Sequence, residues 1–131
     1  MPWLKKQNTV IIAIIAGNTP EDYCAMAEKL SETDVDMIEL NISCPNVKSG
    51  GVQFGTSCES VGAITAAVKK YCKKPLIVKL SPNVTDIASI AQSAEANGAA
   101  AISEWFGRLQ TQLKFRLSVW AVSQAGRMQS R

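Results

Sequence analysis

Two kinds of hydrophobic pattern alternate along residues 9–103. Continuous apolar runs, and in one segment a strict alternation of apolar and polar residues, are typical of β-strands. Between them, apolar residues recur every three or four positions, which is typical of amphipathic helices. The strand patterns lie at residues 9–16, 37–42, 76–80 and 99–103. One helical pattern follows each of the first three.

Strands that alternate with helices pair in parallel through right-handed crossovers. The pattern therefore predicts an α/β fold with about four parallel strands and three helices. In the second strand, Ile38, Leu40 and Ile42 share one side of the chain, whereas Glu39 and Asn41 lie on the other. We expect the apolar side to face the helices.

Local signals mark where each helix begins. Thr19 is a favourable capping residue, and Pro20 suits the first position of the helix after it. Ser57 is the candidate cap of the second helix. For the third helix, Thr85 and Asp86 are both candidates.

The candidate chemistry gathers where the second strand ends, in the stretch ELNISCPNVKSGGVQFG at residues 39–55. Here a thiol, Cys44, lies between two amides, Asn41 and Asn46. Parallel α/β proteins place their catalytic and binding residues at the carboxyl ends of strands. The stretch is therefore the predicted functional site.

Other polar and reactive residues have simpler interpretations. Free cysteines are usually small buried hydrophobic residues, and we interpret Cys24, Cys58 and Cys72 in this way. Lys79 can be a solvated edge residue, but its place inside the apolar run 76–80 favours a position within the fold.

Composition limits the classes of function. Of the 131 residues, 47% are hydrophobic and 19% are charged, as expected for a globular protein. The net charge is +3, and residues 104–131 hold five of the 14 basic residues but only one of the 11 acidic ones. This basic excess is too small to predict a nucleic-acid partner.

Neither a metal site nor a membrane span is expected. The chain has no histidine and its four cysteines form no C-x-x-C pair. The apolar run 10–16 is too short to cross a bilayer. With free thiols, the expected location is the reducing cytoplasm.

Several motifs together resemble one enzyme family. NISCPN at 41–46, VKSGG at 47–51, FG at 54–55 and VKLSPN at 78–83 resemble the class 1 dihydroorotate dehydrogenases. The similarity covers about residues 3–103 and is greatest to class 1B, which uses NAD through a partner subunit. It implies an FMN-containing TIM barrel that oxidises dihydroorotate to orotate in pyrimidine biosynthesis. The partner electron-transfer subunit would carry FAD and an iron–sulfur cluster.

The resemblance also implies roles for individual residues. Cys44 would be the catalytic base, and Asn41 and Asn46 would bind the substrate. Asn41 and Lys79 would contact FMN. A free thiol has a pKa of about 8.5, so a cysteine base needs neighbours that favour the thiolate or a proton relay.

The resemblance does not extend over the whole chain. A TIM barrel takes about 250 residues and eight βα units, so residues 1–103 are predicted to be a partial barrel. Residues 104–131 are predicted to be a divergent basic tail, with a strand pattern at 113–119 and a frayed polar end at 124–131. One hypothesis for this tail is a frameshifted or truncated gene product.

The leading interpretation is a fragment of the FMN-dependent oxidoreductase that is inactive on its own. The alternative is a non-catalytic partial barrel that binds another protein or a small ligand. A third, weaker interpretation is a basic-tailed binding module. In each case the open edges of the sheet predict self-association.

Overall fold

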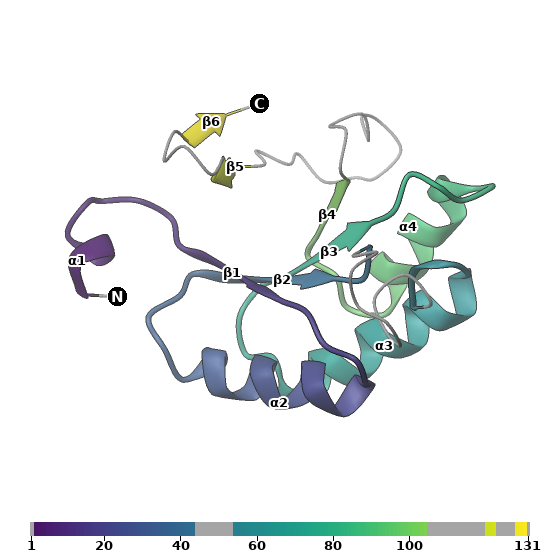
Figure 1. Ribbon diagram of the computed structural model, residues 1–131, viewed down its shortest axis with the longest axis horizontal. Coiled ribbons are helices and arrows are strands. Elements are labelled where there is room, and N and C mark those ends of the chain that lie inside the picture. Colours follow the sequence, from purple (N-terminus) through teal and green to yellow (C-terminus); the bar gives the residue numbers. More distant parts are fainter. Residues whose placement is uncertain (1, 44–53, 105–119, 123–127, 131) are drawn as a thin grey trace.

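The computed structural model of the chain describes residues 2–43, 54–104, 120–122 and 128–130 (Figure 1). In chain order the elements are α1 Pro2–Lys5, β1 Ile12–Ile15, α2 Pro20–Ser31, β2 Met37–Asn41, α3 Cys58–Tyr71, β3 Leu76–Leu80, α4 Ile87–Ala96, β4 Ala101–Glu104, β5 Trp120–Val122 and β6 Met128–Ser130. The first four strands form one sheet, and β5 pairs with β6 in a separate antiparallel hairpin.

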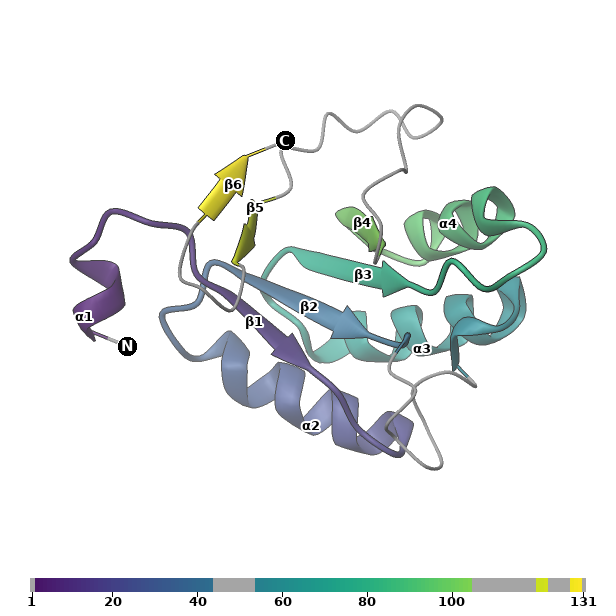
Figure 2. The same cartoon turned by 45° about the horizontal axis from the view of Figure 1, so that its top comes forward.

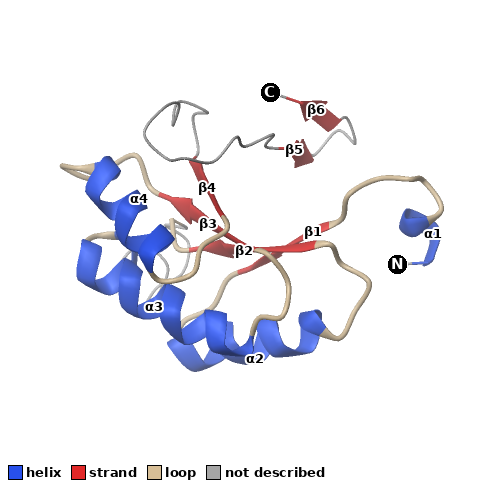
Figure 3. Cartoon of the chain, turned by 180° about the vertical axis from the view of Figure 1, so that it is seen from behind, coloured by secondary structure: helices blue, strands red, loops and turns tan. Residues whose placement is uncertain are grey.

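The main sheet has the strand order β1-β2-β3-β4, and every neighbouring pair is parallel. Helices α2, α3 and α4 all cover the same face of this sheet (Figures 1 and 3). A doubly wound sheet reverses its strand order and carries helices on both faces, whereas a (β/α) barrel winds in one direction. The described elements therefore confirm the predicted partial barrel with four parallel strands.

The hydrophobic core lies between the sheet and the three helices. Alternate side chains of the two central strands point into it and are almost completely buried: Ile38, Leu40, Ile42, Val78 and Leu80. The opposite face of the sheet, here called the inner face, carries Ile12, Ile14, Met37, Glu39, Asn41, Ile77, Lys79, Ala101 and Ser103 in the pairing register. The sheet therefore separates an apolar core from a mixed polar surface.

The predicted helix caps are present. Thr19 Oγ1 accepts a hydrogen bond from the amide of Asp22, and Ser57 forms the corresponding capping box at the start of α3. At α4 the cap is Asp86, the second of the two candidates, whose Oδ1 accepts from the Ser89 amide at 3.1 Å. Each cap satisfies an amide that the first helical turn leaves without a backbone partner.

The two outer strands begin later than the sequence pattern predicts. The predicted first strand starts at residue 9, but β1 starts at Ile12 because the Ile11 amide donates to the carboxylate of Asp36 at 2.8 Å. The fourth strand starts at Ala101 and not at residue 99, because the Ala99 amide still bonds the α4 carbonyl of Ala94 at 3.0 Å.

The tail also differs from the prediction. Residues 124–131 were expected to fray, but Met128–Ser130 pair with Trp120–Val122. The strand expected at 113–119 lies outside the described residues.

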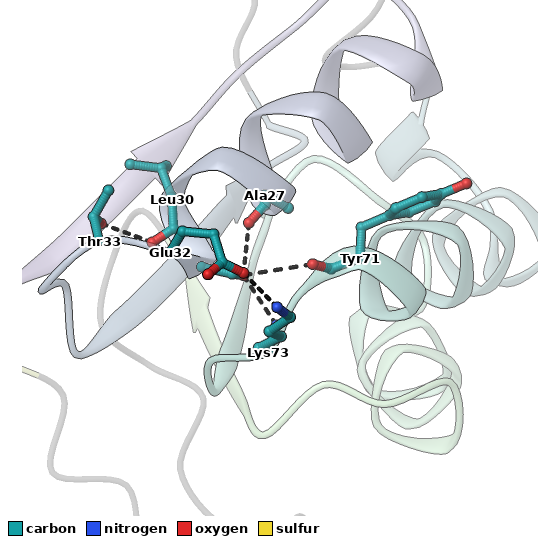
Figure 4. Close-up of polar contacts among 7 residues, drawn as sticks. Ala27, Leu30, Glu32, Thr33, Tyr71 and Lys73 are labelled. Atoms are coloured by element: carbon teal, nitrogen blue, oxygen red, sulfur yellow. Dashed lines mark hydrogen bonds and ion pairs between the residues drawn. The ribbon is translucent and has the colours of Figure 1, made fainter.

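The carboxyl-terminal ends of α2 and α3 are joined through one buried hydroxyl (Figure 4). Ser31 Oγ donates to the carbonyl of Ala27 at 2.7 Å and accepts from the Lys73 amide at 3.0 Å. The Lys73 ammonium also forms an ion pair with Glu32. The two bonds of the Ser31 hydroxyl satisfy a polar group that is buried where the two helices pack, whereas the ion pair lies at the surface.

A second contact ties α2 to the end of β2. The buried hydroxyl of Tyr23 donates to the carbonyl of Asn41 at 3.0 Å, and its ring packs edge-on against Phe54 with the centroids 5.9 Å apart. Tyr23 therefore holds the strand end that carries the predicted site.

We predict that Tyr23→Phe lowers the free energy of unfolding by about 1 kcal/mol, because it removes a buried donor and leaves its acceptor carbonyl short of a bond. Urea unfolding followed by circular dichroism measures this loss. Tyr71→Phe is the matched control, because Tyr71 is 48% exposed. Equal losses in the two variants would contradict a specific role for the Tyr23 hydroxyl.

Candidate functional site

The carboxyl ends of β2 and β3 bring two of the predicted site residues together. Asn41 is the register partner of Lys79, so the two residues lie side by side on the inner face of the sheet. Figure 2 shows the neighbouring strands β2 and β3 that carry them. Neighbouring strands lie about 4.8 Å apart, which places an amide and an ammonium group within reach of one ligand. Both residues are half-buried.

The orientation of the Asn41 amide is set by Ser43. Asn41 Oδ1 accepts hydrogen bonds from the Ser43 amide at 3.2 Å and from the Ser43 hydroxyl at 3.1 Å. Because a backbone N–H can only donate, the oxygen of the amide must face Ser43. The Asn41 NH2 group, a donor of two hydrogen bonds, therefore points away from Ser43.

The other two predicted residues, Cys44 and Asn46, lie outside the described residues. The chain on both sides of this segment is well packed at the end of β2. A Cβ atom at Gly55 would lie only 2.7 Å from the Ile42 carbonyl oxygen, so the returning chain approaches the strand closely. Phe54 packs on Tyr23 at the same place. The segment 44–53 thus leaves and rejoins the described structure at the carboxyl end of β2.

The inner face also contains a polar cluster that the sequence analysis did not identify. The Ser103 hydroxyl donates to Glu39 Oε2 at 3.3 Å, and Lys79 lies close enough to Glu39 to influence its ionisation. Burial raises the pKa of Glu39, while the positive charge of Lys79 and the hydrogen bond from Ser103 act in the opposite direction. The available signal was the alternation in β2, which puts Glu39 on the same face as Asn41.

The three other cysteines do not share one environment. Cys72 is buried as predicted, Cys24 is half-buried, and Cys58 is exposed. The prediction for Cys58 was wrong, because its side chain is exposed at the first position of α3, directly after the cap. Burial, followed by the charge of Glu21, raises the pKa of the Cys24 thiol.

Among the described residues, no three His, Cys, Asp or Glu side chains lie together in a way that would hold a metal ion. No described helix has the length and apolar character needed to span a membrane.

Comparison with known proteins identifies relatives with high sequence identity. The chain matches the dihydroorotate dehydrogenase family model over residues 1–120. The catalytic subunit of dihydroorotate dehydrogenase B (NAD(+)) from Alkaliphilus metalliredigens is 60% identical over 103 residues, which cover 79% of this chain and 34% of that protein. The subunits from Alkaliphilus oremlandii and Petrotoga mobilis are 59% and 53% identical, over 77% and 79% of this chain and 33% and 34% of theirs.

The chain thus spans about a third of the length of these curated relatives. Among solved structures, a rubisco-like protein from Burkholderia fungorum matches 72% of this chain and 24% of its own, with 22% identity and a TM-score of 0.46. The family assignment depends on the sequence matches, and the architecture depends on the strand pairing described above. Because the family model matches residues 1–120 of this chain, the chain belongs to the dihydroorotate dehydrogenase family.

Proposed function

We propose that this chain is a segment of an FMN-dependent oxidoreductase that converts dihydroorotate to orotate in pyrimidine biosynthesis. The proposal is supported by the pairing of Asn41 with Lys79 on the inner face. Asn41 lies at the end of β2, just before the segment of the sequence that contains Cys44. The names of the relatives support the same activity. The segment would supply the catalytic loop and part of the surface beneath the flavin.

The described residues fit an FMN site. A flavin ring presents carbonyl oxygens and nitrogens along one edge, and it accepts a hydride when it is bound to such an enzyme. Lys79 offers an ammonium group that complements the negative charge of a reduced flavin. Asn41 offers an amide whose orientation Ser43 sets, so its NH2 group is positioned before any ligand arrives.

The proposed roles of the remaining residues follow from their chemistry. Cys44 would take a proton from dihydroorotate as the catalytic base, and its thiol needs a local environment that lowers its pKa or relays the proton. Asn41 and Asn46 would bind the substrate, because amides match the alternating donors and acceptors of a planar pyrimidine ring.

The electron acceptor in this proposal is NAD, reached through a partner subunit with FAD and an iron–sulfur cluster. Support comes from the names of the relatives, which specify NAD(+) and a catalytic subunit. The proposed location is the cytoplasm. We also propose that residues 1–103 are the enzymatic part and that residues 104–131 are a divergent basic tail.

We propose further that the 131-residue chain alone is inactive and associates with itself. In the described sheet, β1 and β4 are the edge strands, each paired on one side only. Ile14 on the inner face is 61% exposed and Val10, just before β1, is 38% exposed. Unpaired strand edges and exposed apolar residues both favour association.

To test the role of Cys44, we would replace the matching segment of the Alkaliphilus metalliredigens catalytic subunit with residues 1–103 of this chain. We expect the chimera to bind FMN and oxidise dihydroorotate. Cys44→Ala should lower its turnover by about a hundredfold or more, the usual range for a lost general base, and leave the flavin content unchanged.

Cys58→Ala is the matched control in this chimera, because Cys58 is an exposed thiol outside the predicted site. Turnover should be the same as in the parent chimera. A parallel loss of flavin and activity in Cys44→Ala would argue for a structural role of that residue. A chimera that binds flavin but does not oxidise dihydroorotate would reject the proposed substrate.

For the chain alone, we predict a concentration-dependent mixture of oligomers in sedimentation velocity and weak or undetectable binding in an FMN titration. Ile14→Lys should shift the mixture toward monomer, because a charge on the edge strand disfavours further pairing. Tyr71→Lys, which changes an exposed residue on a helix, should not. A monodisperse monomer with tight, stoichiometric FMN would contradict the proposal.

A further inference from the structure

One charged side chain on the inner face has no role in the proposed reaction. Glu39 is the middle inner-face residue of β2. On the same face, β1 contributes Ile12 and Ile14, β3 contributes Ile77 and Lys79, and β4 contributes Ala101 and Ser103. Among the described side chains on the inner face of these four strands, the charged ones are Glu39 and Lys79. Glu39 is half-buried, in a position where apolar residues are usual.

The hydrogen bond to Ser103 reveals where the carboxylate lies. Glu39 and Ser103 are on strands that flank β3, so their backbones are about 10 Å apart, twice the usual strand spacing. A distance of 3.3 Å between Ser103 Oγ and Glu39 Oε2 is possible only if the Glu39 side chain extends across β3.

The strand register places this crossing beside Lys79. Glu39 lies opposite Ile77, whereas Ser103 lies opposite Lys79, the next inner-face residue along β3. A side chain that runs from Glu39 toward Ser103 therefore passes over β3 between Ile77 and Lys79. Its carboxylate ends at the level of Lys79.

The electrostatics agree with this placement. Of the charged groups around Glu39, Lys79 is the one that lowers its pKa, against the stronger effect of burial. A half-buried carboxylate opposes folding unless it is paired and hydrogen-bonded. Here the ammonium group comes from β3 and the hydrogen bond from β4, so three adjacent strands take part.

We propose that Glu39 is a positioning residue for Lys79: its carboxylate, held across β3 by the Ser103 hydroxyl, keeps the Lys79 ammonium on the inner face beside Asn41. The importance of this arrangement for catalysis rests on the proposed function, in which Lys79 contacts the flavin. The arrangement itself is a property of the four described strands and requires no ligand.

The first test measures the ionisation of Glu39 in the full 131-residue chain. Carbon-13 NMR of chain labelled at the glutamate carboxyl groups gives one titration curve per residue, and the signal absent in Glu39→Gln identifies Glu39. Lys79→Met should raise the midpoint of the Glu39 curve by about one pH unit, because a nearby positive charge stabilises the carboxylate. Ser103→Ala should raise it by a smaller amount. Lys29→Met, which removes the same charge from an exposed position on α2, should leave it unchanged.

The second test measures Lys79. In a brief acetylation with an excess of reagent, followed by peptide mass spectrometry, Glu39→Gln should increase the labelling of Lys79 relative to Lys29 by roughly threefold or more, because Lys79 loses the carboxylate that holds its ammonium group on the inner face. Glu39→Asp retains the charge, but its side chain is one methylene shorter and does not reach Ser103, so its labelling of Lys79 should lie between those of the parent chain and Glu39→Gln. A residue with only a packing role would not give this order.

An unchanged Glu39 midpoint in Lys79→Met would overturn the proposal, as would equal labelling of Lys79 in Glu39→Gln and the parent chain. If circular dichroism shows that Glu39→Gln does not fold, Glu39→Asp identifies the Glu39 signal instead, and the Lys79→Met and Ser103→Ala titrations decide, since both retain Glu39. Neither measurement contains flavin or substrate. Failure of the dehydrogenase assay above therefore rejects the proposed function without affecting this result, and the reverse also holds.

Discussion

Burial of alternate residues in β2 against the helices determines which side chains face the candidate site. Ile38, Leu40 and Ile42 are completely buried on the helix side, so Glu39 and Asn41 must point to the inner face. A shift of one residue in the strand register would exchange the two sets and put a carboxylate and an amide into the hydrophobic core. The core therefore supplies the free energy that holds these polar groups at the site, and Tyr23 secures the strand end through the Asn41 carbonyl.

The charge of Glu39 opposes the stability that the core provides. Because the pKa of Glu39 is raised in the folded chain, the folded state binds the proton on this carboxyl more tightly than the unfolded state does. This contribution to stability is complete at pH values below the pKa of the unfolded chain, and it is lost as the pH rises through the raised pKa of the folded chain. Ionisation of Glu39 thus opposes folding. A carboxyl group with this effect that still reaches across β3 is more easily explained by the proposed flavin contact of Lys79 than by the architecture of the sheet.

The sequence predicts most of the fold because local patterns and the core agree. The third strand has the predicted bounds, Leu76–Leu80, since the mostly apolar run LIVKL lies between Pro75 and the polar Ser81. The first and fourth strands were predicted too long, because the amides of Ile11 and Ala99 bond to a side chain and to a helix end and not to a neighbouring strand. Periodicity contains no information about such partners.

The candidate site was only partly predictable, for a related reason. Asn41 and Lys79 could be identified because each lies in a short motif at the end of its own strand. Glu39 and Ser103 lie 64 positions apart, and only the strand order and register show that one side chain reaches the other across β3. The same register places Asn41 next to Lys79 and directs Glu39 toward Lys79. Correct pairing of β2, β3 and β4 is therefore what joins the proposed flavin contact and its positioning residue into one site, and any change that shifts β3 would disrupt both together.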